Sequence, residues 1–144
     1  MLHPFNWDNL GAIAGLTWQN FYFRLFEGSI KSPQVIEFLK HLRRHVPGKL
    51  LLIWDGAAIH RSQLVRQYLA SQHGEVWVER LPAYAPELNP VEYLWAYWKQ
   101  HELPNLCARD LWQLSGWAAH GLRRMRRKKT RLIAAFWQQA ELWP

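Results

Sequence analysis

The stretch LLLIWDGAAIH, residues 50–60, places an acidic residue directly after a short apolar run. The run of five apolar residues at 50–54 predicts a strand buried on both faces of a parallel or mixed sheet. Ligands of open α/β sheets bind beyond the carboxyl ends of the strands, so Asp55 stands where it can reach a site. Asp-Gly is also a common turn pair, and the sequence leaves both interpretations of Asp55 open.

Two apolar and aromatic segments, 9–18 and 20–28, precede this strand and predict a β-hairpin. Ser32 is the expected N-cap of a helix with Pro33 at its first position, and Pro47-Gly48 ends that helix. After the strand at 50–54 the pattern predicts a helix at 62–71, a strand at 75–79, an extended proline-rich loop at 81–90, and helices at about 90–102, 108–128 and 130–142. The strand–helix–strand order favours a parallel pair beside the antiparallel hairpin, which makes a mixed α/β sheet.

A second carboxylate, Glu92, follows the proline-rich loop in the sequence NPVE, residues 89–92. Asn89 is the expected N-cap, and Glu92 at the third helical position would suit a capping box. Asp55 changes this interpretation, because both acids then follow neighbouring parallel strands at one sheet edge. Paired carboxylates are suitable ligands for Mg²⁺, and two such ions can activate water and stabilise a leaving oxygen in phosphodiester cleavage. His60 could orient a phosphate, support a ligand or be an exposed residue at a helix start.

Three elements together, LLLIWDGAAIH, LPAYAPELNPVEYLW at 81–95 and Lys99, resemble the catalytic core of IS630-family transposases, in the Tc1/mariner superfamily. The loop leading into the N-P-x-E-x-x-W pattern is the most specific of the three. The segment from Trp7 through the hairpin is also similar to that family, so the resemblance covers nearly the whole chain.

The resemblance implies an RNase H-like fold and a DDE endonuclease. In the family, two Asp and one Glu bind two divalent ions, Mg²⁺ or Mn²⁺. Asp55 matches the second acid and Glu92 the third, while His60 and Asn89 match motif positions around them. The implied function is cleavage at the ends of an insertion sequence followed by strand transfer into target DNA at TA dinucleotides, by a homo-oligomer on the DNA.

The chain departs from the family at the first acid, which lies on a strand upstream of the hairpin in family members. Asp8 is the only acid among the first 26 residues, and it does not match that position. We therefore expect residues 1–144 to be a partial catalytic domain that lacks the first, central strand. It would divide into an RNase H-like core at 1–103 and a basic helical extension at 104–144. An upstream transposase fragment would be its partner, and the chain alone would be inactive.

Charge is concentrated near the carboxyl end. Residues 109–144 hold eight Lys and Arg against two acids, while residues 1–108 hold ten against nine. Seven cations lie within nine positions: Arg123, Arg124, Arg126, Arg127, Lys128, Lys129 and Arg131. No acid interrupts this run, which favours contact with DNA phosphates over a solvated helical face. No apolar run approaches the length of a membrane span, and we expect a bacterial cytoplasmic, nucleoid-associated protein.

Two other functions remain open at this stage. A decayed transposase could persist as a noncatalytic DNA-binding or assembly module, which the missing first acid favours. A single-metal nuclease using Asp55 and His60 is the weaker alternative, because no further His or carboxylate stands close enough in sequence to complete a motif.

Overall fold

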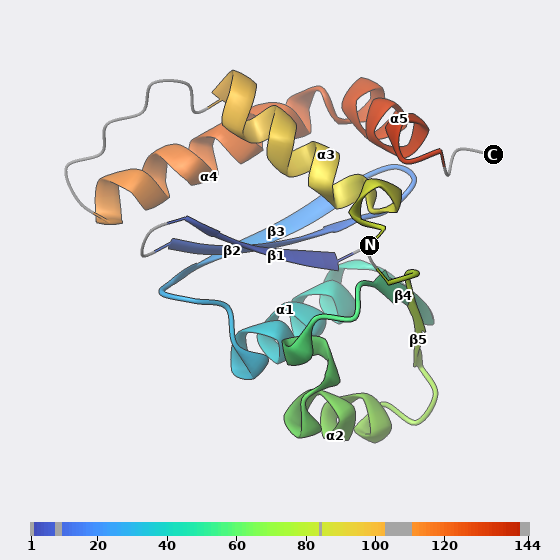
Figure 1. Ribbon diagram of the computed structural model, residues 1–144. Helices are drawn as coiled ribbons and strands as arrows, with labels where there is room; N and C mark the ends of the chain where they lie inside the picture. Colours follow the sequence, from blue (N-terminus) through green and yellow to red (C-terminus); the bar gives the residue numbers. More distant parts are fainter. Residues whose placement is uncertain (1, 8–9, 84, 103–110, 142–144) are drawn as a thin grey trace.

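The computed structural model describes residues 2–7, 10–83, 85–102 and 111–141. Within them, one mixed sheet has the strand order β3-β2-β1-β4-β5 (Figure 1). The strands are β1 (Leu2–Trp7), β2 (Leu10–Leu16), β3 (Phe21–Glu27), β4 (Leu50–Trp54) and β5 (Val76–Arg80). β1, β2 and β3 pair antiparallel, whereas β4 runs parallel to both β1 and β5. The hairpin and the mixed α/β sheet predicted from the sequence are confirmed.

Helices cover both faces of the sheet, as Figure 1 shows. One face carries α1 (Ser32–His45) and α2 (Gln63–Ser71), and the other carries α3 (Pro90–Tyr97), α4 (Leu111–Arg127) and α5 (Lys129–Gln139). Short turns of helix connect them: η1 (Ala58–Arg61), η2 (Pro86–Leu88) and the π-helical η3 (Trp98–Glu102), which follows α3 directly. No helix in the described part of the chain is long and apolar enough to cross a membrane.

β2 separates two hydrophobic cores, because its successive side chains point to opposite faces of the sheet. Leu10, Ala12, Ala14 and Leu16 pack against α3, α4 and α5, whereas Ile13 packs against α1 on the other face. α4 and α5 therefore belong to the same core as the sheet. The predicted boundary at 103/104 lies outside the described residues.

A hydrogen bond connects the N-terminal ends of α1 and α2. Lys31, not Ser32 as predicted, is the N-cap of α1, and its backbone N–H donates to Gln34 Oε1 at 3.0 Å. Ser32 instead donates a 2.7 Å hydrogen bond to Ser62 Oγ. Ser62 is the N-cap of α2 and accepts from the Val65 N–H. This hydroxyl pair holds the N-terminal ends of α1 and α2 together.

We expected the first, central strand to be missing, and a short strand from residues 2–7 occupies the central position of the sheet. The absence of the family's own acid-bearing first strand stays a prediction. β1 lies between β2 and β4, with Leu2 next to Gly15 on one side and Trp54 on the other. Its sequence, LHPFNW, has a proline at its third position and no regular alternation, which argues against a strand in a sequence-based analysis. The pairing with β2 is local, so this segment fills the central position in spite of its low strand propensity.

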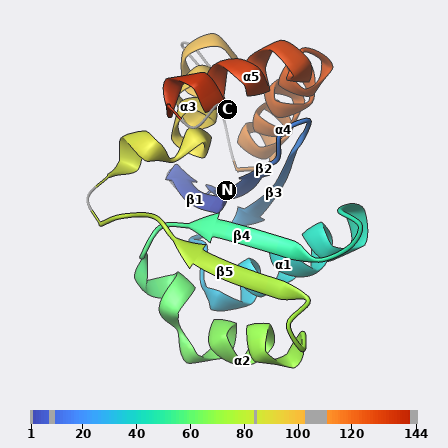
Figure 2. The same cartoon turned by 90° about the vertical axis from the view of Figure 1, so that its right-hand side faces the viewer.

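The apolar sequence of β4 predicted a strand buried on both faces, but only one face is buried. Leu52 and Trp54 are buried against the α1–α2 side, but Leu51 is 60% exposed and its cross-strand neighbour Trp77 is 63% exposed. The reason is the placement of α3, α4 and α5, which lie over β1, β2 and β3 and leave the same face of β4 and β5 uncovered (Figure 2).

Candidate active site

Asp55 directly follows β4, and its side chain forms the turn that the sequence left open. Its Oδ1 accepts a 3.0 Å hydrogen bond from the Ala57 N–H, two residues on. The side chain remains 34% exposed, so a ligand can reach it. The turn and the position beyond the strand end are therefore compatible: the turn orients a carboxylate that still faces solvent.

His60, on η1, is packed behind this carboxylate and is not exposed. The residue is 3% exposed, and its ring stacks on Trp54 with 4.3 Å between centroids and 6° between planes. Its Nδ1 lies 3.1 Å from Asp55 Oδ1 and 3.2 Å from the Asp55 carbonyl oxygen. Its Nε2 is buried, with no hydrogen-bond partner among the described residues.

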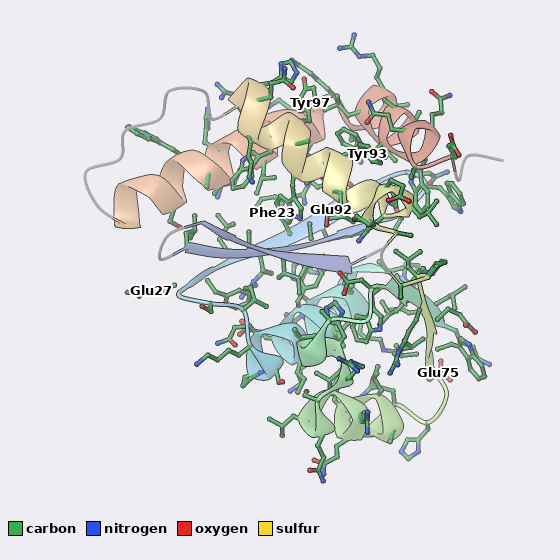
Figure 3. The ribbon with its side chains drawn as sticks, in the orientation of Figure 1. Phe23, Glu27, Glu75, Glu92, Tyr93 and Tyr97 are labelled. Atoms are coloured by element: carbon green, nitrogen blue, oxygen red, sulfur yellow. The ribbon has the colours of Figure 1, made fainter. Side chains whose placement is uncertain are left out.

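Glu92 and Asn89 come from the start of α3, where the sequence predicted a helix. Asn89 is the N-cap, and its Oδ1 accepts from the Val91 N–H at 3.1 Å. Asn89 is 2% exposed, and its Nδ2 has no hydrogen-bond partner among the described residues. Glu92 is half-buried, and Figure 3 shows it between α3 and the sheet.

The loop before α3 is held at both ends, which positions these residues. The Leu81 N–H donates to the Trp54 carbonyl oxygen at 2.9 Å, so the loop starts beside the end of β4. At the other end, the Tyr93 hydroxyl donates to the Glu87 carbonyl oxygen at 2.9 Å. The loop was predicted to be extended throughout, but Pro86–Leu88 forms the 3-10 turn η2 before Asn89.

Asp55 and Glu92 both line one cavity of about 200 Å³. Its lining comprises Asp55, Gly56, Leu81, Pro82, Ala83, Ala85, Pro86, Asn89 and Glu92. The parallel pairing of β4 with β5 produces this meeting, because the chain leaves both strands at the same sheet edge. The cavity thus contains two hard oxygen ligands of the kind that bind divalent cations, with an amide donor beside them.

A third ligand is not found in the described residues. No group of three or more His, Cys, Asp or Glu side chains among them is placed to hold a metal ion. β1 contains no acidic residue at all, and His3 is its next residue after Leu2, the partner of Trp54. The central strand of this chain thus has no acid at the place where family members have their first one, and Asp8 lies outside the described residues.

The basic run divides into side chains with different environments. Arg126 points inward from α4: its Nη2 donates to the Phe21 carbonyl oxygen at 3.0 Å. Its guanidinium lies 5.3 Å from the ring centre of Phe21 and 5.2 Å from that of Phe23, which Figure 3 shows between α4 and the sheet. Burial is the main cause that lowers the Arg126 pKa. Sequence reasoning missed this internal role, because nothing in a run of cations distinguishes the inward-facing member.

Arg124 is paired with Glu102 of η3, with 2.7 Å between Nε and Oε2. Besides Arg124, the exposed members of the run are Arg123, Arg127, Lys128 and Arg131, with Lys129 half-buried. An open surface pocket of about 540 Å³ lies at the junction of α4 and α5, lined by Arg127, Lys128, Thr130 and Arg131. The outward charge is thus gathered at the helix junction.

Comparisons with known proteins identify the family and the fold of this chain. A family model described as DDE superfamily endonuclease matches residues 4–115. The chain belongs to this family. No curated protein matches the chain.

Solved structures of the Mos1 mariner transposase share the fold. The crystal structure of its catalytic domain has a TM-score of 0.69 at 17% identity, covering 98% of this chain and 76% of that one. The Mos1 paired end complex with Mn has a TM-score of 0.70 at 17% identity, covering 92% of this chain and 42% of that one. The Mos1 catalytic domain with Raltegravir and Mg has a TM-score of 0.64 at 18% identity, covering 98% of this chain and 78% of that one. The predicted RNase H-like fold and DDE endonuclease class are confirmed, while assignment to the IS630 family stays a prediction.

Proposed function

We propose that this chain is the DNA-cleaving part of an insertion-sequence transposase of the IS630 family. The observation that carries the proposal is the meeting of Asp55 and Glu92 in one cavity at the carboxyl edge of parallel strands. This donor set fits Mg²⁺ or Mn²⁺, because carboxylate oxygens are hard ligands. Two ions held in the complete site would supply a Lewis acid and an activated water for phosphodiester cleavage. Strand transfer of the freed 3′-hydroxyl into target DNA would follow.

The chain's own residues have distinct parts in this proposal. Asp55 and Glu92 hold the cations. Asn89 has a buried Nδ2 without a partner in the described residues, and it lines the same cavity. An amide donor there suits a phosphate oxygen of the bound strand, whose negative charge the carboxylates alone would repel.

DNA contact outside the cavity would come from cations of the α4–α5 junction: the exposed Arg123, Arg127, Lys128 and Arg131, and the half-buried Lys129. They are candidates for phosphate contacts because a cation facing water can replace the counterions of DNA. Arg124 is a weaker candidate because it is already paired with Glu102. Arg126 is assigned to packing, because its guanidinium donates to the Phe21 carbonyl oxygen and lies beside the Phe23 ring of β3. Transposon ends and target DNA are the proposed partners, bound by a homo-oligomer in the bacterial cytoplasm.

We further propose that the third carboxylate comes from a strand beside β4, supplied by the upstream part of the transposase. Among the described residues β1 meets β4 only at Leu2 and Trp54. A cavity of about 70 Å³ lies farther back along β4, where Leu50, Leu51 and Leu52 face the end of β2 and α1. A longer strand could pair along this edge of β4 and bring an acid next to Asp55. Until it does, we expect the chain to be inactive.

The noncatalytic alternative is supported by one observation, the absence of an acid on β1. In that case the chain would bind DNA through the helix junction without cleaving it. Nicking of supercoiled plasmid distinguishes the two functions. The chain should nick DNA with Mg²⁺ or Mn²⁺ only when the upstream fragment is added, and Asp55→Asn and Glu92→Gln should abolish that nicking. Retention of DNA binding without any nicking in the mixture would favour the noncatalytic module.

A further inference from the structure

We infer that His60 is a positioning residue, which holds the Asp55 carboxylate in a single orientation through its Nδ1–H. This inference rests on the proposed function, because it takes Asp55 to be a metal ligand. It adds a role for a buried ring that does not itself line the cavity of Asp55 and Glu92. Three contacts of the ring, together with its burial, support this role.

The first contact fixes the plane of the ring. His60 is stacked almost parallel on Trp54, which is itself 1% exposed and pairs with β1 and β5 in the sheet. A ring in full contact with a buried indole cannot turn without losing that contact. The sheet therefore sets the direction in which Nδ1 points.

The second and third contacts fix the tautomer. Nδ1 lies within hydrogen-bond distance of two oxygens of Asp55, one from the carboxylate and one from the backbone. Both oxygens are acceptors, so Nδ1 must carry the proton. Nε2 is buried with no partner among the described residues. Burial of its unprotonated lone pair there costs less free energy than burial of an N–H group without an acceptor. The ring therefore donates to Asp55 through Nδ1.

Asp55 Oδ1 thus has two polar contacts: it accepts a hydrogen bond from the Ala57 N–H, and it lies 3.1 Å from His60 Nδ1, which is also in hydrogen-bond contact with the Asp55 carbonyl oxygen. One donor would leave the carboxylate free to rotate about the hydrogen bond, whereas two donors from different directions define its plane. Groups that orient a ligand in this way commonly change metal affinity by about 10- to 100-fold when they are removed. A histidine at this position thus acts on the metal through Asp55.

Two substitutions separate positioning from packing. His60→Phe keeps a ring on Trp54, removes the donor and removes the buried Nε2 that lacks a partner. His60→Asn removes the ring that stacks on Trp54 but places an amide N–H near the position of Nδ1. The control is His120→Phe, the same substitution at an exposed histidine of α4.

The first readout needs no metal. Hydrogen exchange of the Ala57 amide reports whether Asp55 Oδ1 stays in place. His60→Phe should speed this exchange about fivefold, the effect of weakening one ordinary hydrogen bond, while its melting temperature stays level or rises. His60→Asn should retain Ala57 protection although it melts lower. Unchanged Ala57 exchange in His60→Phe, or exchange that only follows thermal stability across the variants, would overturn the positioning role.

The second readout is the affinity for Mn²⁺ alone, followed by paramagnetic broadening of amide signals around the cavity. We expect about tenfold weaker binding in His60→Phe, less weakening in His60→Asn and none in His120→Phe. Absence of local broadening in the wild-type chain would count against the metal site of the proposed function. The Ala57 result would still decide the role of His60. Equal Mn²⁺ affinity in the wild type and His60→Phe would contradict the inference.

Discussion

Arg126 donates a hydrogen bond across 3.0 Å to the backbone carbonyl of Phe21, a residue 105 positions earlier in the chain. The contact ties the basic helix α4 to the start of β3, and the Phe21 and Phe23 rings lie beside the guanidinium. One cation of the basic run thus stabilises the fold while its neighbours face water.

We expect Arg126→Ala to lower the free energy of unfolding by about 2 kcal/mol, from the loss of a charged hydrogen bond and two cation–π contacts. Arg127→Ala, the adjacent and exposed residue, should change it by less than about 0.5 kcal/mol. Urea denaturation measures both. Equal effects of the two substitutions would show that Arg126 has no special part in packing.

DNA affinity should depend on the exposed cations. Replacing Arg123, Arg127, Lys128 and Arg131 by Ala should reduce the slope of log affinity against log salt by up to about 3.6, because each of four phosphate contacts contributes roughly 0.9. The matched control replaces Lys40, Arg44, Lys49 and Arg66, which are exposed on the α1–α2 side. If both quadruple variants lower the slope alike, the helix junction is not the DNA-binding surface.

The two faces of β4 should respond differently to substitution. Leu52→Ala should cost about 2–4 kcal/mol, because Leu52 is buried against α1 and α2. Leu51→Thr should change stability by less than about 0.5 kcal/mol in the isolated chain, where Leu51 is 60% exposed. Thermal or urea unfolding of the two variants tests this. A large loss in Leu51→Thr would mean that this face of β4 is covered in solution.

Stability should also depend on His41 of α1. Burial is the main cause that lowers its pKa below 6.5, and electrostatic interactions with His45, Arg24, Arg44 and Arg126 add to the effect. The folded state therefore binds a proton less readily than the unfolded state, and stability should rise with pH up to about 6.5 and level off above it. His41→Gln should flatten this dependence in unfolding measured from pH 5 to 8. A slope that survives the substitution would assign it to other groups.

The sequence predicted the elements whose signals are local. Short patterns of apolar residues predicted the hairpin of β2 and β3 and the strand before Asp55. Capping residues predicted the helix starts at Ser62 and Asn89. The position of Asp55 and Glu92 beyond two strands also follows from the order of elements. These features need no knowledge of distant contacts.

Features set by distant contacts could not be predicted. β1 contains Pro4 and has no alternating pattern, and only its place between β2 and β4 makes it a strand. The exposure of Leu51 depends on which strands α3, α4 and α5 cover. The burial of His60 depends on the Trp54 ring, and the inward turn of Arg126 on Phe21 and Phe23.

The register of β1 offers a gain-of-function test for the missing acid. His3 is the next residue of β1 after Leu2, the partner of Trp54, just as Asp55 is the next residue of the chain after Trp54. His3→Asp should place a third carboxylate at this edge of the sheet and tighten Mn²⁺ binding at least several-fold, since each added hard oxygen ligand favours the cation. His3→Asn is the uncharged control. Isothermal titration should separate the two variants, and identical affinities would show that this position does not reach the site.

The central claim is that Asp55 and Glu92 together bind a divalent cation. The most direct measurement is paramagnetic broadening of backbone amide signals on titration with Mn²⁺, in the wild-type chain, Asp55→Asn and Glu92→Gln. We predict broadening centred on the residues around the cavity, such as Gly56, Ala57 and Asn89, with at least tenfold weaker binding in either variant. Broadening centred elsewhere, or unchanged by both substitutions, would contradict the account.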